Sequence, residues 1–511
     1  NCDWSSDVCS SDLYISTTMS GLATTPYHEQ SYTDGFFDVS GRTGFLPIRD
    51  PLAALPERYA ELQQLMVDMP TNKVYPDVPG VLSRSGEIVD RVAALPDYTE
   101  TVKQETDIFV WHALYRAFTF LCSAYTLEAS HHSTVDGIYG RGRSLLPGHV
   151  ARPLVWVAEK LDVYPYLDYH YAYSLGNYVK IDPTGTLHWK NLDMACKFSG
   201  TPDEIGFIML HVYINELSPK LVDCVMKVGK GGHAHDDMLK CAHTMMEINS
   251  RRKEMWAASR HERYNDFRIF IMGIKGNEAI YGDGLVYDTC FDNVPQTYRG
   301  QTGAQDSLIP MMDIFSGVVD FYPENKLTEY LLDLRTYRPK CVQQFFIDLR
   351  DFYGKNPLFS TLVSGGRYEE LVYLLKIVDE IYLFRNGHWQ FVQKYIMANT
   401  KFATATGGTP ITSWLINQIE AVLRYEGAII AALAAHTAEK ADFVSTLSAE
   451  AASFYVALSS SHANKTQMLH EQVAMLQSED VDVKLVYETN IKHHLEDAAG
   501  GEGTTGCPHL K

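Results

Sequence analysis

The sequence predicts an all-α protein made of two helical domains. Apolar residues recur at spacings of three and four over most of the chain, which is the periodicity of amphipathic helices. Loops marked by proline and glycine separate these segments, and stretches typical of strands are few and weak. The chain has 511 residues, which is long enough for two domains with a large core.

The first part of the chain is expected to hold an arm and a small domain. Residues 1–45 are polar and rich in turn formers, which predicts a disordered arm; residues 1–13 look like translated adaptor sequence foreign to the fold. Residues 46–190 predict a small, mostly helical domain. Its expected helices are Glu57–Val67, Thr101–Leu127 and His149–Leu161, and weak strands are expected within Tyr166–Tyr178 and Val179–His188.

Residues 191–440 predict a larger helical domain, in which the apolar periodicity runs over longer segments. A glycine-rich interval between residues 276 and 303 interrupts them, and loops of that length are usually functional or mobile. The expected helices are Asp203–Lys227, Asp236–Met272, Gln305–Ser316, Lys326–Tyr337, Lys340–Tyr353, Tyr368–Met397 and Thr412–His436.

Residues 441–485 predict a helical extension. Its apolar positions are spaced 3, 4, 3 and 4 residues apart, which indicates a packed helix or a short coiled seam; they are Val444, Leu447, Ala451, Phe454 and Leu458. Residues 486–511 are polar and end in a glycine-rich segment, which predicts a flexible tail.

Composition narrows the classes of partner. Apolar residues make up 46% and charged residues 21% of the chain, as in soluble globular proteins. The formal net charge of −19 argues against nucleic acid or an anionic membrane surface as a partner. No apolar run reaches the ~20 residues of a membrane span. The nine cysteines form no CxxC pair, which favours reduced thiols and a cytoplasmic location.

The stretch Arg385–Tyr395, RNGHWQFVQKY, holds the first candidate site. Arg385 and His388 lie three residues apart, so they share one face if the helix continues through Gly387. An imidazole there is suited to binding a metal, and the guanidinium to holding an anion. Taken alone, however, this pattern favours a partly buried histidine at a helix kink.

Three further positions carry both a structural and a functional interpretation. His211 lies in an apolar helical segment, where a core histidine is the usual finding. Arg268 has apolar neighbours, so it must pair with an anion, for which a structural carboxylate is the simpler choice and a ligand carboxylate the alternative. The segment Tyr298–Ser307 is either a solvated loop or a set of backbone N–H groups for an anion.

In this order the motifs resemble the indoleamine 2,3-dioxygenase family. The match covers about residues 146–423 at high specificity, and the small domain matches more loosely through LLPGHVARPLVWVAEKLDVYP. The motifs are GFxxxHV at Gly206–Val212, RxFxxGxKGN at Arg268–Asn277, DGLVYD at Asp283–Asp288, RGQTGAQDS at Arg299–Ser307, RNGHWQFVQKYI at Arg385–Ile396 and TGGT at Thr406–Thr409.

The resemblance implies an all-helical enzyme with haem b (iron-protoporphyrin IX) held between its two domains. Such enzymes insert both atoms of O₂ into the indole ring of L-tryptophan and form N-formylkynurenine, the first product of the kynurenine pathway. An electron donor keeps the iron ferrous. Two alternatives are a dioxygenase of the same fold acting on another indole, and a haem or O₂-binding protein without catalytic activity.

The resemblance also assigns roles on the haem side. His388 falls on the proximal iron ligand, and Arg385 on the arginine that contacts a haem propionate. Thr302 and its neighbour Gly303 fall in the loop close to the propionates.

On the substrate side, Arg268 falls on the arginine that pairs with the substrate carboxylate, and Thr406 on the threonine near the substrate's ammonium and carboxylate groups. Phe207 falls on an aromatic residue that packs against the indole. Tyr125 is expected to be a further aromatic residue of the pocket. Together with Arg268, His211 is expected to be catalytic, through a hydrogen bond to the dioxygen or to the indole N–H.

Two positions depart from the family pattern. Position 211 is a serine in mammalian members and a histidine here, as in several microbial relatives. Arg263 stands where a phenylalanine is usual, so an extra cation is expected in the pocket unless Tyr264 takes the aromatic role. This departure questions the preference for tryptophan more than the haem.

Overall fold

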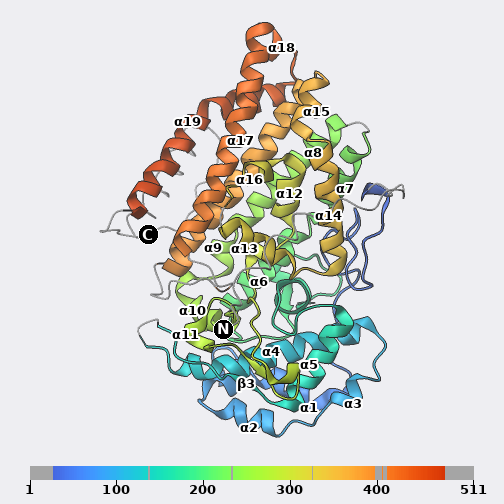
Figure 1. Ribbon diagram of the computed structural model, residues 1–511, viewed down its shortest axis with the longest axis vertical. Coiled ribbons are helices and arrows are strands. Elements are labelled where there is room, and N and C mark those ends of the chain that lie inside the picture. The colour runs from blue at the N-terminus through green and yellow to red at the C-terminus, as the bar shows by residue number, and fades with distance from the viewer. Residues whose placement is uncertain are drawn as a thin grey trace, which may run out of the picture.

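The structure is a computed structural model, and it describes residues 27–135, 138–231, 234–324, 326–397, 406 and 411–477. The shorter helices of the first part gather at one end of the molecule, and the long helices of the second part extend from them (Figure 1). Among these residues, strand is confined to three two-stranded sheets, so the predicted all-α class is confirmed. The expected division into two domains at residue 190 stays a prediction.

The first part is organised around α4 (Ile108–His132), which is buried along most of its length. The side chain of Asp107 accepts a hydrogen bond from the backbone N–H of Phe109, so this residue caps the helix. Helix α5 (Gly148–Leu161) packs beside α4. The smaller helices of this part are α1 (Ala60–Asp68), α2 (Glu87–Ala93) and α3 (Thr99–Val102).

The second part is organised around α16 (Tyr368–Phe391), which contacts α8 (Ala234–Lys253), α17 (Ile411–Glu439) and α19 (Ala449–Gln477). Its residues are buried on every side, which explains why its apolar pattern is continuous rather than one-sided. Shorter helices complete this part: α11 (Glu278–Tyr281), α12 (Leu308–Ser316), α13 (Lys326–Arg335), α14 (Lys340–Lys355), α15 (Leu358–Ser364) and α18 (Phe443–Thr446).

Two predicted helices are divided. The segment expected at residues 203–227 forms α6 (Pro202–Asn215) and α7 (Ser218–Gly229), and Pro219 in the first turn of α7 cannot continue the preceding helix. The helix expected at residues 236–272 ends at Lys253. Beyond it lie α9 (Met255–Ala258), α10 (Asn265–Arg268) and two 3₁₀ turns, and the hydroxyl of Tyr395 donates to the carbonyl of Ser259 between them.

The three sheets are small. Strands β1 (Asn72–Val74) and β2 (Val78–Pro79) are antiparallel, as are β4 (Tyr178–Lys180) and β5 (Leu192–Met194). Strand β3 (Leu145–Leu146) runs parallel to β6 (Val286–Tyr287), which attaches the glycine-rich interval to the first part of the chain. In the described part of the chain, every helix is too short or too polar to cross a membrane.

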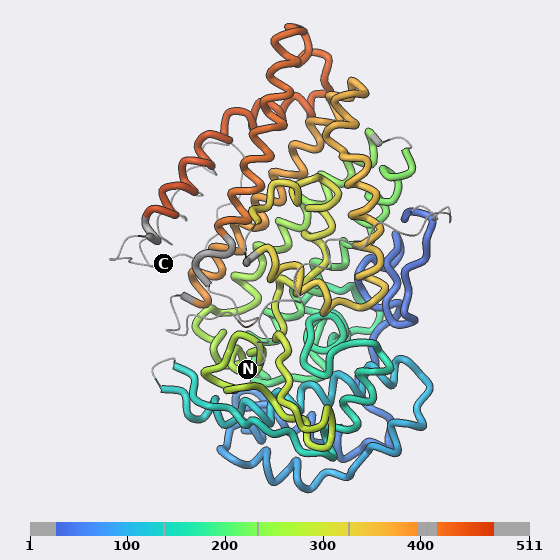
Figure 2. The backbone as a smooth tube through the Cα atoms, in the orientation of Figure 1, coloured from blue at the N-terminus to red at the C-terminus, as the bar shows by residue number. Residues whose placement is uncertain are grey.

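The expectation of a disordered arm is wrong for residues 27–45. Tyr27, Tyr32, Phe36 and Phe37 are at most 2% exposed. The Tyr27 hydroxyl donates to the carbonyl of Val225 in α7, and the aromatic rings pack against those of α14 and α4. The tube in Figure 2 shows this segment running along the side of the helical body. The tail at residues 486–511 lies outside the described residues.

The C-terminal extension is joined to the core by buried charges. On α19, Lys465 donates to Asp379 of α16 (2.6 Å) and to Glu426 of α17 (3.0 Å). Lys376 pairs with Asp379 from within α16. The Lys465 side chain is 12% exposed, so these pairs lie in a region of low dielectric constant.

We expect Lys465→Met to lower the free energy of unfolding by about 2–3 kcal/mol, because Glu426 and one oxygen of Asp379 lose a charged donor. Urea unfolding measures this change. The surface pair Lys355–Asp351, whose lysine is 72% exposed, supplies the control, and Lys355→Met should cost less than about 1 kcal/mol. Equal losses in the two variants would show that the α19 contact is not stabilising.

Candidate active site

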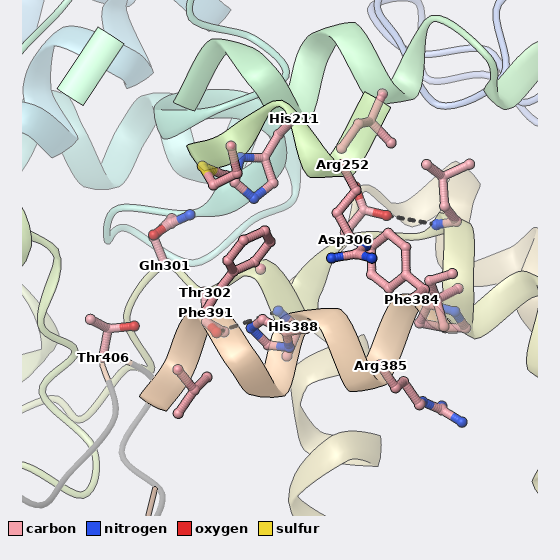
Figure 3. Close-up of a pocket in the computed structure, with 18 of the residues that line it drawn as sticks. His211, Arg252, Gln301, Thr302, Asp306, Phe384, Arg385, His388, Phe391 and Thr406 are labelled. Atoms are coloured by element: carbon pink, nitrogen blue, oxygen red, sulfur yellow. Dashed lines mark hydrogen bonds between the residues drawn. The ribbon is translucent and has the colours of Figure 1, made fainter. Parts of the chain in front are cut away.

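An internal cavity of about 260 Å³ lies between α6, α16 and the loop before α12. Its lining is mainly apolar and includes aromatic side chains from three separate elements, among them Phe207, Tyr264 and Phe391. Most of the predicted site residues line it; they are Phe207, His211, Tyr264, Thr302, Gly303, Arg385, His388 and Thr406. Figure 3 shows His211 and His388 on opposite sides of this space.

His388 lies on α16, which continues through Gly387 and ends at Phe391, before a π-helical turn at Val392–Met397. Trp389 is fully buried on another face, so the helix cannot rotate to turn His388 away from the cavity without exposing the indole. Neither ring nitrogen of His388 bonds to a residue that the structure describes. Burial lowers the pKa of His388 to about 4, so the ring is neutral at pH 7, the form that binds a metal.

Arg385 lies on the same helix, but its side chain points away from His388 (Figure 3). Its Nη2 donates to Asp313 of α12 (2.6 Å) and to the hydroxyl of Tyr322 (2.7 Å). Its Nη1 is buried and has no hydrogen-bond partner in the part of the chain that the structure describes. Burial raises the pKa of Asp313, whereas the charge of Arg385 opposes that shift. Asp313 therefore fixes the orientation of the Arg385 guanidinium and leaves its Nη1 available to a ligand.

Sequence reasoning missed three further cations of the cavity, Arg252, Arg335 and Arg338. The side chain of Arg335 makes no hydrogen bond or ion pair with the described part of the chain, and Nη1 of buried Arg338 has no hydrogen-bond partner there. Burial and the charge of Arg335 lower the pKa of Arg338 to about 9. In the sequence these arginines look like ordinary solvated residues near helix ends, so only the tertiary structure reveals that they line the cavity.

The charge of the cavity lining is unbalanced. Four guanidinium groups line it against two carboxylates, which leaves a formal surplus of two positive charges. The carboxylates belong to Asp306 and Asp313. Asp306 accepts hydrogen bonds from the Tyr169 hydroxyl and from Asn215, so its charge is already engaged. An anionic ligand would neutralise the surplus.

His211 is held in one tautomer. Its Nδ1 lies 3.0 Å from the carbonyl oxygen of Phe207, which can only accept, so Nδ1 carries the proton. Burial lowers the pKa of His211, which keeps the ring neutral, although the charge of Asp306 opposes this shift. Its Nε2 is then an acceptor. This atom lies near the loop before α12, because a Cβ built on Gly303 would be 3.8 Å from it.

Two close contacts between glycines hold that loop. A Cβ at Gly300 would lie 2.3 Å from the backbone nitrogen of Gly273, and one at Gly273 would be equally crowded, so neither position accepts a side chain. Thr302 then caps the 3₁₀ turn Gly303–Gln305 in a capping box. Thr406 is held to the same strip of backbone, because its carbonyl accepts from the N–H of Gly273 (2.8 Å).

The expected cation at position 263 does not enter the cavity. Arg263 lies at the end of a 3₁₀ turn and pairs with Asp266 (2.8 Å), with 39% of its side chain exposed. Tyr264 lines the cavity instead, and its ring centre is 5.0 Å from that of Phe207. The aromatic side chain at this part of the cavity is therefore that of Tyr264, and Arg263 adds no charge to the lining.

Two predicted residues do not line this cavity. Tyr125 lies on α4, where its ring stacks with the guanidinium of Arg143. Arg268 is fully buried behind Tyr264, and its Nη1 donates to the hydroxyl of Tyr139 (2.9 Å). The expected role of Tyr125 as an aromatic residue of the pocket stays a prediction.

Comparison with known proteins agrees with this site. The family model described as indoleamine 2,3-dioxygenase matches residues 34–428. Indoleamine 2,3-dioxygenase 1 of Mus musculus is 23% identical, over 69% of this chain and 82% of its own length. An indoleamine 2,3-dioxygenase of Aspergillus candidus is 25% identical, over 74% and 94%. A 6-hydroxytryptophan 2,3-dioxygenase of Fusarium equiseti is 25% identical, over 71% and 84%.

The family match extends over more than three quarters of the chain and includes every element that lines the cavity. The relatives are oxidoreductases that their names assign to indole-containing compounds. The chain is a dioxygenase that belongs to the indoleamine 2,3-dioxygenase family.

Proposed function

We propose that the protein is a haem-dependent dioxygenase that opens the indole 2,3 bond of L-tryptophan and forms N-formylkynurenine. One observation carries the proposal. A neutral imidazole without a hydrogen-bond partner among the described residues, His388, faces a cavity whose opposite wall holds the acceptor nitrogen of His211 and the ring of Phe207. A ligand nitrogen on one wall, and an acceptor with an aromatic ring on the other, suit a metal-bound planar group and an aromatic substrate.

The cavity fits haem b in charge and polarity. Haem b carries two propionates, and the lining has a surplus of two positive charges. The Nη1 atoms of Arg385 and Arg338 are buried donors without partners among the described residues, and each could donate to a carboxylate oxygen. His388 would supply a ligand nitrogen to its iron. The haem would supply the iron that activates O₂; an external electron donor would keep that iron ferrous.

We assign His211 the role of accepting a hydrogen bond from the indole N–H. Its Nδ1 is committed to the Phe207 carbonyl, so Nε2 offers a lone pair and no proton. The Phe207 ring lies 5.7 Å from the His211 ring and forms the adjoining wall. Together they would fix the plane of the indole, and this positioning lowers the entropic part of the barrier.

We expect His211→Ala to lower kcat/KM for L-tryptophan about fivefold, as the loss of one neutral hydrogen bond of about 1 kcal/mol predicts. The same substitution should leave kcat/KM for 1-methyltryptophan unchanged, because that substrate has no indole N–H. Steady-state kinetics with both substrates measures the difference. An equal loss for both substrates would contradict the assignment.

The polar end of the substrate is assigned to Thr406 and Arg268. Thr406 lies at the cavity wall in Figure 3 and is held there by Gly273. Arg268 lies one layer behind the cavity wall, close to Tyr264. Burial raises the pKa of Tyr264 to about 12, and the charge of Arg268 opposes this shift. Its Nη1 donates to the Tyr139 hydroxyl, so a substrate carboxylate bound by Arg268 would share the guanidinium with that hydroxyl.

We expect Tyr264→Ala to reduce kcat/KM for tryptophan by about tenfold or more, since the substitution removes an aromatic wall of the cavity. Arg263→Ala should change kcat/KM by less than about twofold, because this side chain is a surface group paired with Asp266. The two neighbouring variants are matched controls for each other. A larger loss of kcat/KM for Arg263→Ala would show that Arg263 contributes to the substrate pocket after all.

One experiment tests the function directly. The full chain is purified, supplied with haem, and its Soret band recorded; ascorbate, methylene blue and L-tryptophan are then added, and absorbance of N-formylkynurenine is followed. Formation of this product supports the proposal. A relative is named a 6-hydroxytryptophan dioxygenase, so a hydroxylated tryptophan is tested in parallel, and turnover of that compound alone would favour a different indole. A Soret band without turnover of either would leave a haem-binding protein, and no haem uptake would exclude both.

A further inference from the structure

A fourth cation of the cavity, Arg252, lies beside the proposed iron ligand. It comes from the last turns of α8, which packs against α16, and is 8% exposed. Its Nε donates to Asn249 (3.1 Å) and its Nη2 donates weakly to the carbonyl of Leu383 (3.4 Å). Its guanidinium also lies 5.9 Å and 5.5 Å from the ring centres of Phe384 and Phe391, which precede and follow His388 by one turn.

Gly387 makes this position possible. A Cβ built on Gly387 would lie 1.8 Å from Nη1 and 2.1 Å from Cζ of Arg252, so no other residue could occupy position 387 without displacing the guanidinium. A glycine inside a helix costs about 1 kcal/mol relative to alanine. Here the absence of a side chain at Gly387 lets the Arg252 guanidinium lie against the backbone next to His388.

The charge of Arg252 is not compensated nearby. No carboxylate of the described residues lies within 4 Å of it, and the carboxylate that acts on it from further away, Glu380, is engaged by Lys376 and Asn249. Burial lowers the pKa of Arg252 to about 10, so the group stays charged at pH 7. Its guanidinium lies against Gly387, the residue before His388, so its field reaches the imidazole. Coulomb interactions in such a buried site are screened less than in water.

We propose that Arg252, seated on Gly387, is a positioning residue that acts through the His388 side of the cavity to favour the ferrous over the ferric state of the bound haem iron. The inference rests on the proposed function, since it requires haem at His388. A fixed positive charge stabilises the state of lower positive charge, and the ferrous ion has one positive charge less. The inference concerns this equilibrium only and adds no electron-transfer step.

The test is a spectroelectrochemical titration of the haem-loaded full chain with redox dyes. At a fixed potential, Arg252→Met should reduce the ratio of ferrous to ferric protein about fivefold, which equals about 41 mV at 59 mV per tenfold. Arg252→Lys, which keeps the charge, should stay within about twofold of the wild type. These two variants separate the charge of Arg252 from its packing.

Arg251 supplies the matched control. It is the neighbouring residue on α8, but it pairs with Glu216 (2.8 Å) and Glu247 (3.0 Å) and does not line the cavity. Arg251→Met removes the same charge from the chain and should leave the ferrous to ferric ratio unchanged. An equal shift in Arg251→Met would mean that net charge, not position, sets the potential, and would overturn the proposal.

Gly387→Ala gives a second variant that keeps the arginine. Its methyl group must push the guanidinium off α16, so the ferrous to ferric ratio should fall in the same direction as in Arg252→Met. In the Arg252→Met background the same substitution should have no further effect. An additive shift would show that Gly387 and Arg252 act independently, against the proposal.

The remaining outcomes are also decisive. Loss of haem affinity in Arg252→Met with an unchanged potential would make Arg252 a propionate ligand and overturn the inference alone. An unchanged or higher potential with haem fully bound would do the same. If the wild type took up no haem, or kept its spectrum in His388→Ala, the proposed function would fail first and the inference with it.

Discussion

Replacing His388 with alanine is expected to abolish the Soret band of the haem-loaded protein and turnover with it. His388 is the neutral imidazole on the α16 side of the cavity, and no other described side chain of that wall offers a ligand nitrogen. The loss should exceed the ~10–100-fold reduction that follows removal of an outer partner of a metal ligand. Absorbance on titration with haem, followed by the N-formylkynurenine assay, measures both effects.

The fold should survive this substitution, because the imidazole of His388 borders the cavity and makes no hydrogen bond to the described residues. Thermal unfolding of the haem-free variant should therefore match that of the haem-free wild type. His388→Gly with added imidazole should regain the Soret band, since free imidazole fits the space left by the side chain. His211→Ala should retain the band. A variant at 388 with an unchanged spectrum would rule this residue out as the ligand.

Much of the helical fold could be predicted from the sequence because the signals are local. Apolar spacing identified α16 and α19, and a proline near a helix start accounts for the break between α6 and α7. The end of α8 at Lys253 could not be predicted, because the turn that follows is held by the hydroxyl of Tyr395, some 140 residues further along. Long-range side-chain contacts leave no periodic pattern.

The candidate site divides in the same way. Position by position, the family motifs placed His388, His211 and Phe207 on one cavity. They did not settle the choice between Arg263 and Tyr264, because adjacent residues point in different directions and only the packing decides which one faces inward. Arg252, Arg335 and Arg338 were missed, since a cation at a helix end is ordinarily solvated and only tertiary burial distinguishes it.

The C-terminal extension shows what a motif cannot supply. Its apolar spacing predicted one packed helix, whereas Val444 and Leu447 lie before α19, in α18 and in the extended residue that follows it. The family model ends at residue 428, within α17, whereas α19 packs against α16, the helix that carries His388. Lys465 of α19 meets Asp379 of α16 in a buried pair. A segment beyond the family match thus supports the central helix of the site.

Replacing Asp313 with alanine is expected to lower the free energy of unfolding by about 3–5 kcal/mol. Asp313 is the only carboxylate of the described residues within ion-pair distance of Arg385, and both side chains are buried. Alanine leaves the guanidinium in place without its anion and removes the acceptor of the Tyr322 hydroxyl. Urea unfolding of the haem-free protein measures the loss.

A double-mutant cycle separates the charge pair from the packing. Arg385→Met combined with Asp313→Ala should cost clearly less than the sum of the single changes, because no buried charge is then left uncompensated. The pair also holds Arg385 with Nη1 free, so Arg385→Met should weaken haem binding even where stability is restored in the double variant. Additive losses in stability would mean that the pair is not coupled. Unchanged haem affinity in Arg385→Met would show that Asp313 and Arg385 join α12 to α16 and take no part in holding the cofactor.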